Sequence, residues 1–200
     1  GRLLRGLASP RRRLGLLGGS FDPIHNGHLA LAIEMKERAN LDEVLLAPAH
    51  CSPGKVERPP VASNEARAEM VRLAIEGVLG LTCTTLEYDR PSPSYTIDTV
   101  VAIDLPLHLI LGPGSLDHLF SWKEIDRLLA LAPPLLATWD NLERVSPPKK
   151  YEHFFENALY PIPRMEISSS AIRARLKAGL PCPHLTPAKV LDYIYSNRLY

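Results

Sequence analysis

Gly18-Gly19-Ser20-Phe21-Asp22-Pro23-Ile24-His25-Asn26-Gly27-His28 is the stretch of sequence that decides the fold. It follows a short apolar run at 14–17 and precedes 29–39, where apolar residues recur at the spacing of one helix face. This pattern predicts a strand, a turn and a helix. Ligands of open parallel sheets bind beyond the carboxyl ends of the strands, so we expect a binding site at this turn.

The same alternation continues along the chain and predicts an α/β protein with a doubly wound parallel sheet and a small C-terminal helical part. We expect Ser94 and Thr186 each to cap a helix, and Pro187 to be the first residue of the helix that Thr186 caps. No element is assigned to the polar, proline-broken residues 139–157. The expected strands are 14–17, 44–47, 81–86, 107–111 and 135–137, and the expected helices are 29–39, 66–78, 95–103, 122–130, 170–178 and 187–197.

Composition limits the class of protein. A chain of 200 residues with 46% hydrophobic content can bury one core, so we expect a single domain over 14–200 after a flexible basic tail at 1–13. The net charge of +1 predicts neither a nucleic-acid nor a membrane partner. The three cysteines form no C-x-x-C pair, and no secretory leader is recognised, which favours a cytoplasmic protein.

The glycine-rich turn is suited to binding phosphate. Gly18 and Gly19 would let backbone N–H groups approach an anion, and the helix that follows would point its positive end at the same place. His25 and His28 would both donate hydrogen bonds to that anion. Histidines near a helix start are often caps or surface residues, but the surrounding eleven residues favour phosphate. A zinc site lacks a third ligand, so no metal-ligating residue is predicted.

A second polar segment at 167–173 places Ser168, Ser169 and Ser170 at a helix start, with Arg173 one turn later. Serines there are commonly N-caps. An arginine in the first turn faces the positive end of the helix dipole, which is unfavourable unless an anion binds. We interpret the segment as a second contact to a triphosphate.

These two segments resemble a known family. Residues 18–28 match the GGxFDPxHxGH signature of the adenylyltransferases with an HxGH motif, and 167–173 resembles their ISSTxIR signature with Ser170 in place of Thr. Residues 93–99, 110–116, 193–200 and Trp122 are similar to bacterial nicotinate mononucleotide adenylyltransferases. The resemblance covers nearly the whole chain after Leu14.

The resemblance implies a Rossmann-like fold that binds ATP, with Mg²⁺, beside nicotinate mononucleotide, and it leaves formation of a homodimer open. His25, His28 and Arg173 would be catalytic. Trp122 would stack on the nicotinate ring near the backbone of Tyr95 and Thr96, although a tryptophan is more often plain core. The residues implied to bind ATP are Gly18, Gly19, Ser20, Phe21, Lys55, Gly112, Ser168, Ser169 and Ser170.

Three positions depart from the family pattern. Gly114 replaces an aspartate, Gly54 replaces a histidine before Lys55, and Trp139-Asp140 replaces an Arg-Pro-Gly-like stretch. The departures leave the identity of the acceptor open between nicotinate mononucleotide, its amide and phosphopantetheine. They also leave open a nucleotide-binding module without turnover. A fragment related to class I aminoacyl-tRNA synthetases would share the His-x-Gly-His element, but the chain lacks a basic RNA face.

Overall fold

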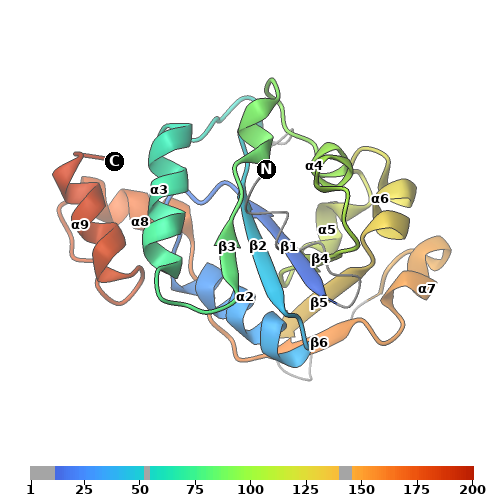
Figure 1. Cartoon of the computed structure of the whole chain (residues 1–200). Helices are drawn as coiled ribbons and strands as arrows, with labels where there is room; N and C mark the ends of the chain where they lie inside the picture. Colours follow the sequence, from blue (N-terminus) through green and yellow to red (C-terminus); the bar gives the residue numbers. More distant parts are fainter. Residues whose placement is uncertain (1–11, 52–54, 140–145) are drawn as a thin grey trace. The chain divides into compact units, whose positions relative to one another are not determined.

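The computed structural model describes residues 12–51, 55–139 and 146–200. Most of the expected tail at 1–13 lies outside these ranges, as does Gly54. Within them, six strands form a sheet in the order β3-β2-β1-β4-β5-β6 (Figure 1), and β4, β5 and β6 are parallel to their neighbours β1, β4 and β5. The strands are β1 (Leu14–Gly19), β2 (Glu43–Pro48), β3 (Leu81–Cys83), β4 (His108–Leu111), β5 (Pro134–Trp139) and β6 (Leu159–Ile162).

Helices connect the strands, as expected for a parallel sheet. Short 3₁₀ helices occur at η2 (Leu86–Asp89) and η3 (Lys149–Tyr151). The α-helices are α2 (Asn26–Arg38), α3 (Asn64–Ile75), α4 (Thr96–Ile103), α5 (Leu116–Leu119), α6 (Ile125–Leu131), α7 (Glu152–Phe155), α8 (Ser169–Lys177) and α9 (Ala188–Ser196).

The strand order reverses beside β1. The chain first runs outward through β2 to β3 and then returns to place β4 on the other side of β1, where Gly15 pairs with His108 and Leu16 with Leu109. This is the doubly wound arrangement, and the prediction of a Rossmann-like α/β fold is confirmed. The carboxyl end of β1 therefore adjoins the reversal, where such sheets bind ligands.

The described residues gather into two compact units. Unit 1 consists of the described residues of 1–17, 31–45 and 95–164, and unit 2 of those of 18–30, 46–94 and 165–200. The chain passes from one unit to the other within β1, α2 and β2. A single domain over 14–200 stays a prediction.

Unit 1 has its core around β4 and β5. Leu109, Ile110 and Leu111 are all buried in β4, and α4 packs against α6. A Cβ atom added to Gly15 in β1 would lie 2.7 Å from Cδ1 of Ile110 and 2.8 Å from Cδ1 of Leu41. The core therefore packs directly against the bare backbone at Gly15, which explains a glycine inside this strand.

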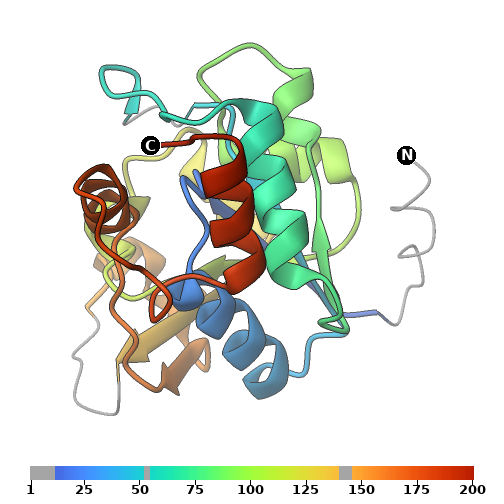
Figure 2. The ribbon, with the colours of Figure 1, turned by 90° about the vertical axis from the view of Figure 1, so that its left-hand side faces the viewer.

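Unit 2 has a core between α3 and α9, two helices that lie far apart in the sequence. α9 packs against α3 (Figure 2), and Met70, Val190 and Ile194 are buried. Ser63 caps α3, accepting a hydrogen bond from the backbone N–H of Ala66 at 3.1 Å.

Some expected boundaries are wrong. The run 81–86 is a strand only as far as Cys83, and η2 follows at Leu86. The expected helix 122–130 begins at Ile125 instead, because Glu124 has a left-handed φ of 50° that interrupts the helix after α5. Residues 139–157 include η3 and α7. β6 was not predicted, since its four residues include a proline and it lies at the sheet edge.

Two of the expected caps are also wrong. Ser94 is buried, and its Oγ accepts from the backbone N–H of His50 at 3.1 Å, while α4 begins after Tyr95. The hydroxyl of Thr186 donates to the carbonyl oxygen of Ile24 at 2.8 Å, and Pro187 occupies the cap position of α9. Both hydroxyls make contacts between distant segments, which local sequence cannot reveal.

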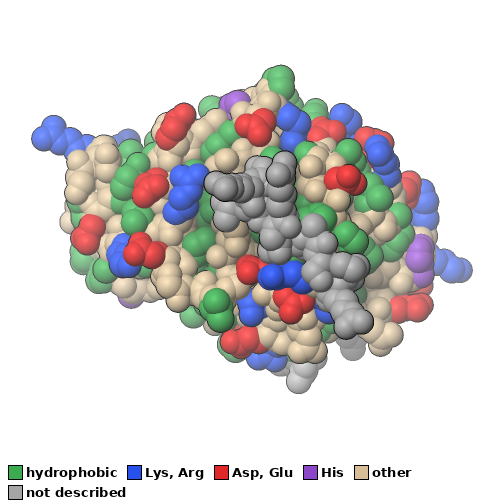
Figure 3. Space-filling view, viewed as in Figure 1, with side chains coloured by type: hydrophobic (Ala, Val, Ile, Leu, Met, Phe, Trp, Pro, Cys, Tyr) green, Lys and Arg blue, Asp and Glu red, His purple; other side chains and the backbone are tan. Residues whose placement is uncertain are grey.

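The visible surface carries mixed charge. Apart from the grey atoms, acidic and basic side chains are interspersed over the face seen in Figure 3, in keeping with a net charge of +1. No helix in the described part of the chain is long and apolar enough to cross a membrane.

Candidate nucleotide-binding site

The turn after β1 differs from the expected glycine turn. Gly18 and Gly19 are the last two residues of the strand, and the left-handed conformation falls on Phe21, with φ of 49°. A Cβ atom at Gly19 would lie 3.3 Å from the Phe21 ring. Phe21 is buried, so its packing stabilises a backbone conformation that a phenylalanine rarely adopts.

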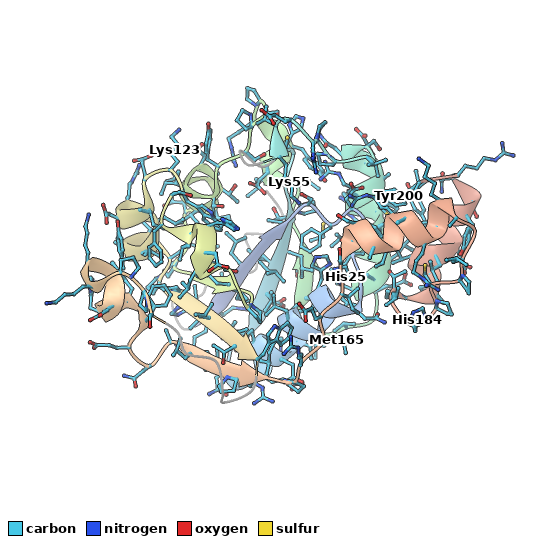
Figure 4. All side chains as sticks on the ribbon, turned by 180° about the vertical axis from the view of Figure 1, so that it is seen from behind. His25, Lys55, Lys123, Met165, His184 and Tyr200 are labelled. Carbon is cyan, nitrogen blue, oxygen red and sulfur yellow. The ribbon has the colours of Figure 1, made fainter. Side chains whose placement is uncertain are left out.

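The absence of a side chain at Gly27 leaves the space in which the His25 ring lies. A Cβ atom at this position would lie 2.9 Å from Cε1 of His25 and 3.3 Å from the carbonyl oxygen of Met165. Figure 4 labels His25 and Met165, which come from different segments of unit 2. The His-x-Gly-His spacing thus lets the His25 ring lie against bare backbone at the start of α2.

The two imidazoles are oriented by the backbone around them. Nδ1 of His25 accepts from the N–H of Gly27 at 3.0 Å, and Nδ1 of His28 accepts from the N–H of His25 at 3.1 Å. The rings are stacked with centroids 3.7 Å apart. An Nδ1 atom that accepts a hydrogen bond carries no proton, so the proton of each neutral ring lies on Nε2. Both rings can therefore donate from Nε2.

Burial keeps these histidines neutral. It lowers the pKa of His25 from 6.5 to about 4. Burial, followed by the nearby charges of His25 and Lys55, lowers the pKa of His28 well below its usual value. At neutral pH both side chains can serve as hydrogen-bond donors to an anion, but they hold no spare proton to transfer.

Three cationic side chains line the same pocket, Lys55, Arg58 and Arg173, and two of them have resolved side-chain contacts there. Nζ of Lys55 donates to Oγ of Ser20 at 2.9 Å, and partial burial, followed by the charge of Arg173, lowers the pKa of Lys55. Nη1 of Arg173 donates to the carbonyl oxygen of Asp22 at 2.8 Å. Because these cations repel each other, an anion bound between them would relieve the repulsion.

Arg67 joins the ends of several segments of unit 2. Its guanidinium, 1% exposed, donates to the carbonyl oxygens of Ser20, Ala49, His50 and Ala62 at 2.6 to 3.1 Å. Sequence reasoning missed this residue, because an arginine in α3 looks like a surface side chain. Its position among the buried residues of that helix was the only signal.

The start of α8 uses its serines within the protein. Oγ of Ser168 caps the helix by accepting from the N–H of Ala171 at 3.3 Å. Oγ of Ser169 donates to the carbonyl oxygen of Pro23 at 2.9 Å, which ties α8 to the turn after β1. Oγ of Ser170 accepts from Nη2 of Arg173 at 3.2 Å.

These elements enclose one pocket of about 720 Å³ in unit 2. His28 and Arg173 share it, although they lie near opposite ends of the sequence. Gly18, Gly19 and Ser168 flank it without lining it. The lining residues are Ser20, Phe21, Asp22, His25, His28, Lys55, Glu57, Arg58, Pro59, Pro60, Ser169, Ser170 and Arg173.

The expected acceptor residues lie in unit 1. Thr96 begins α4 after Tyr95, and Trp122 is half-buried rather than plain core. Nζ of Lys123 lies 4.5 Å from the centroid of the Tyr95 ring, which brings the residues around Trp122 close to the start of α4.

Gly112 and Gly114 also belong to unit 1, at the end of β4. Gly114 has φ of 83°, and a Cβ atom there would meet nothing within 4 Å. The glycine therefore suits the backbone conformation, in which an aspartate would be strained. Trp139 ends β5, and Cζ of Arg164 lies 5.9 Å from the centroid of its ring. Gly54 lies outside the described residues.

No three His, Cys, Asp or Glu side chains in the described ranges are grouped to hold a metal ion. The Asp22 carboxylate in the pocket already accepts from the N–H groups of Val61 and Ala62. This set of donors fits a metal that arrives on phosphate oxygens better than one held by the protein alone.

Comparison with known sequences identifies the protein family. A family model described as cytidylyltransferase-like matches residues 16–175. A probable nicotinate-nucleotide adenylyltransferase of Streptococcus pyogenes is 37% identical, covering 96% of this chain and 90% of the relative. The corresponding protein of Streptococcus mutans is 34% identical over 95% of this chain and 89% of its own length. The chain belongs to the nicotinate-nucleotide adenylyltransferase family.

Solved structures share the fold. Nicotinic acid mononucleotide adenylyltransferase of Plasmodium falciparum, complexed with NaAD, has a TM-score of 0.73 at 19% identity, covering 95% of this chain and 98% of the other. The same enzyme complexed with APC gives a TM-score of 0.71 at 18% identity, with the same coverage. These structures support the fold, and the relatives at 34–37% identity confirm the family predicted from the two sequence signatures.

Proposed function

We propose that this protein transfers the adenylyl group of ATP to nicotinate mononucleotide, forming nicotinate adenine dinucleotide and pyrophosphate in NAD biosynthesis. The observation that carries the proposal is the pocket of unit 2, where two neutral imidazoles, Lys55, Arg173 and the start of α8 meet. Such a set of donors suits a polyphosphate. The names of the curated relatives support the choice of reaction.

The chemistry requires no general base. The 5′-phosphate of the acceptor has a second pKa of about 6 and is mostly a dianion at neutral pH. One of its oxygens attacks the α-phosphorus of ATP, the bond from that phosphorus to the bridging oxygen breaks, and pyrophosphate leaves with the electron pair. The protein must therefore position two anions that repel each other and stabilise the charge that develops.

We assign that stabilisation to the pocket residues. Nε2 of His25 and of His28 would donate to phosphate oxygens near the reacting phosphorus. Lys55 and Arg173 would compensate the charge of the triphosphate, and the N–H groups at the start of α8 would add the positive end of its dipole. Gly18, Gly19, Ser20 and Phe21 would bring the backbone after β1 to the nucleotide.

We infer that magnesium accompanies ATP. When bound to the phosphates, the ion would neutralise part of their charge. Asp22 would stay with its own hydrogen-bond donors, since both carboxylate oxygens are occupied. Lys55 and Arg173 would act on the remaining charge directly.

For the acceptor, we propose Tyr95, Thr96 and Trp122 of unit 1, with Gly112 at the end of β4 contacting ATP. The half-buried Trp122 ring would be available to stack on a pyridine ring. We expect the reaction in the cytoplasm, and we leave a homodimer as a proposal for solution measurements.

A pyrophosphate-release assay tests the function. Purified protein is incubated with ATP and Mg²⁺ and with nicotinate mononucleotide, nicotinamide mononucleotide or phosphopantetheine in turn, and the products are identified by mass spectrometry. We expect the fastest release with nicotinate mononucleotide. Faster release with another acceptor would reassign the substrate, and ATP binding without release under any condition would indicate a silent nucleotide-binding module.

A further inference from the structure

Asp22, one of the residues that line the pocket, lies at the centre of a hydrogen-bond cluster. Its side chain is buried, and Oδ2 accepts from the N–H of Val61 at 2.8 Å while Oδ1 accepts from the N–H of Ala62 at 3.0 Å. A third donor comes from a distant part of unit 2: the hydroxyl of Tyr200 donates to Oδ1 at 2.6 Å. Short contacts of this kind are typical of a hydroxyl bound to a carboxylate.

Arg173 contacts the same aspartate without closing a full ion pair. Its Nη1 atom donates to the backbone carbonyl of Asp22 at 2.8 Å but lies 3.7 Å from Oδ2, beyond good hydrogen-bond distance. Nη2 donates to Oγ of Ser170. The guanidinium is thus anchored by neutral oxygens, and its charge is only partly compensated by the carboxylate.

We propose that Tyr200 is a positioning residue: by holding Oδ1 of Asp22, its hydroxyl prevents the carboxylate from closing on Arg173 and leaves the guanidinium available to the triphosphate. Tyr200 does not line the pocket, so it acts only through Asp22. The inference rests on the proposed function in one respect, that the anion bound in the pocket is the triphosphate of ATP.

The local structure supports this role. Tyr200 follows α9, and the N–H of Leu199 donates to the carbonyl oxygen of Ile194 at 3.0 Å, which directs the chain back after the helix. α9 is in turn packed on α3. Burial, and then the hydrogen bond to Asp22, raise the pKa of Tyr200, so the hydroxyl stays protonated and remains a donor. Figure 4 labels Tyr200 together with two residues that do line the pocket, Lys55 and His25.

The test is the substitution Tyr200→Phe, which removes one oxygen atom and keeps the ring. Tyr195→Phe on the exposed face of α9 is the matched control, since Tyr195 is 57% exposed. Dissociation constants for Mg·ATP and for adenosine are measured by calorimetry on both variants and on the parent protein, with melting temperatures alongside. Turnover with nicotinate mononucleotide gives KM for ATP and kcat separately.

We expect Tyr200→Phe to weaken ATP binding roughly five- to tenfold and to raise KM for ATP similarly, because a carboxylate released from one donor competes with phosphate for Arg173. Adenosine binding and kcat should change by less than about twofold, and Tyr195→Phe should match the parent. In an Asp22→Asn background, the same Tyr200→Phe change should have no further effect on ATP binding.

Three results would overturn the proposal. These are unchanged ATP binding in Tyr200→Phe, a proportionate loss of ATP and adenosine binding with a much lower melting temperature, or an undiminished effect in the Asp22→Asn background. The binding measurements need no acceptor. A parent protein that binds ATP but forms no dinucleotide would therefore contradict the proposed function alone.

Discussion

His28 has its Nδ1 atom occupied by the backbone N–H of His25, so Nε2 is the atom left to meet an anion. Removing the ring should remove a donor aimed at charge that develops during the reaction. We expect His28→Ala to lower kcat roughly 10²- to 10³-fold. The measurement is steady-state pyrophosphate release, with circular dichroism to verify the fold. The control is His153→Ala, at an exposed position of α7. Near-normal turnover in His28→Ala would contradict the role of His28 as a donor to the reacting phosphate.

The buried histidines also predict a pH dependence of stability. Because the pKa of His25 is about 4 in the folded protein and 6.5 when exposed, the unfolded chain binds more protons between these values. The stabilising effect is complete above pH 6.5 and is lost as the pH falls toward 4; the lowered pKa of His28 acts in the same direction. Urea unfolding at stepped pH should show this decline.

The contribution of the histidines can be separated from that of other groups. In a variant carrying His25→Asn and His28→Asn, the decline between pH 6.5 and 4 should be shallower than in the parent protein, because two groups that titrate only in the unfolded chain are gone. Identical slopes for the two proteins would show that neither imidazole is kept neutral by folding.

At the scale of elements, the start of α2 depends on Gly27. A methyl group there would lie 2.9 Å from the His25 ring, so the ring must move. We expect Gly27→Ala to cost about 1–3 kcal/mol of unfolding free energy and to lower kcat, since His25 loses its orientation. The control is Ala30→Gly, a substitution in the same helix as Gly27. Gly77→Ala would be a poor control, because the positive φ of Gly77 strains any other residue. Unchanged kcat in Gly27→Ala would contradict the dependence.

Arg67 links α3 to the segments after β1 and β2 through four carbonyl oxygens. Arg67→Met should leave these buried acceptors without donors and cost about 3 kcal/mol or more. Arg72→Met on the same helix removes only an exposed pair with Glu69 and should change stability by about 0.5 kcal/mol or less. Chemical denaturation of both variants measures the difference, and equal stabilities would refute the structural role of Arg67.

At the scale of the whole molecule, the two substrates should leave separate footprints. The pocket lies in unit 2, whereas Tyr95, Thr96 and Trp122 lie in unit 1. In hydrogen exchange, Mg·ATP alone should protect amides at 18–30 and 165–175 most strongly, because binding stabilises the segments that contact the ligand. Nicotinate mononucleotide should add protection at 95–97 and 120–123. Protection by ATP confined to unit 1 would contradict the assigned pocket.

Local sequence alone determined the class of fold and two of the segments that build the pocket. The strand before Gly18, the helix after His25 and the serines before Arg173 depend on periodicity and helix-end chemistry, which act over a few residues. Their two signatures also identified the family, and both segments line the pocket. The alternation of strands and helices predicted the doubly wound sheet for the same reason.

Tertiary structure alone decided which polar groups hold the pocket in place. Arg67 looked like a surface residue, Ser94 and Thr186 looked like caps, and the family resemblance at 193–200 assigned Tyr200 no partner, yet each makes contacts with segments far along the chain. β6 was missed because its strand identity comes from pairing with β5 at the sheet edge. Burial creates these roles: a polar group removed from water must find a partner, and only the folded chain determines which partner is within reach.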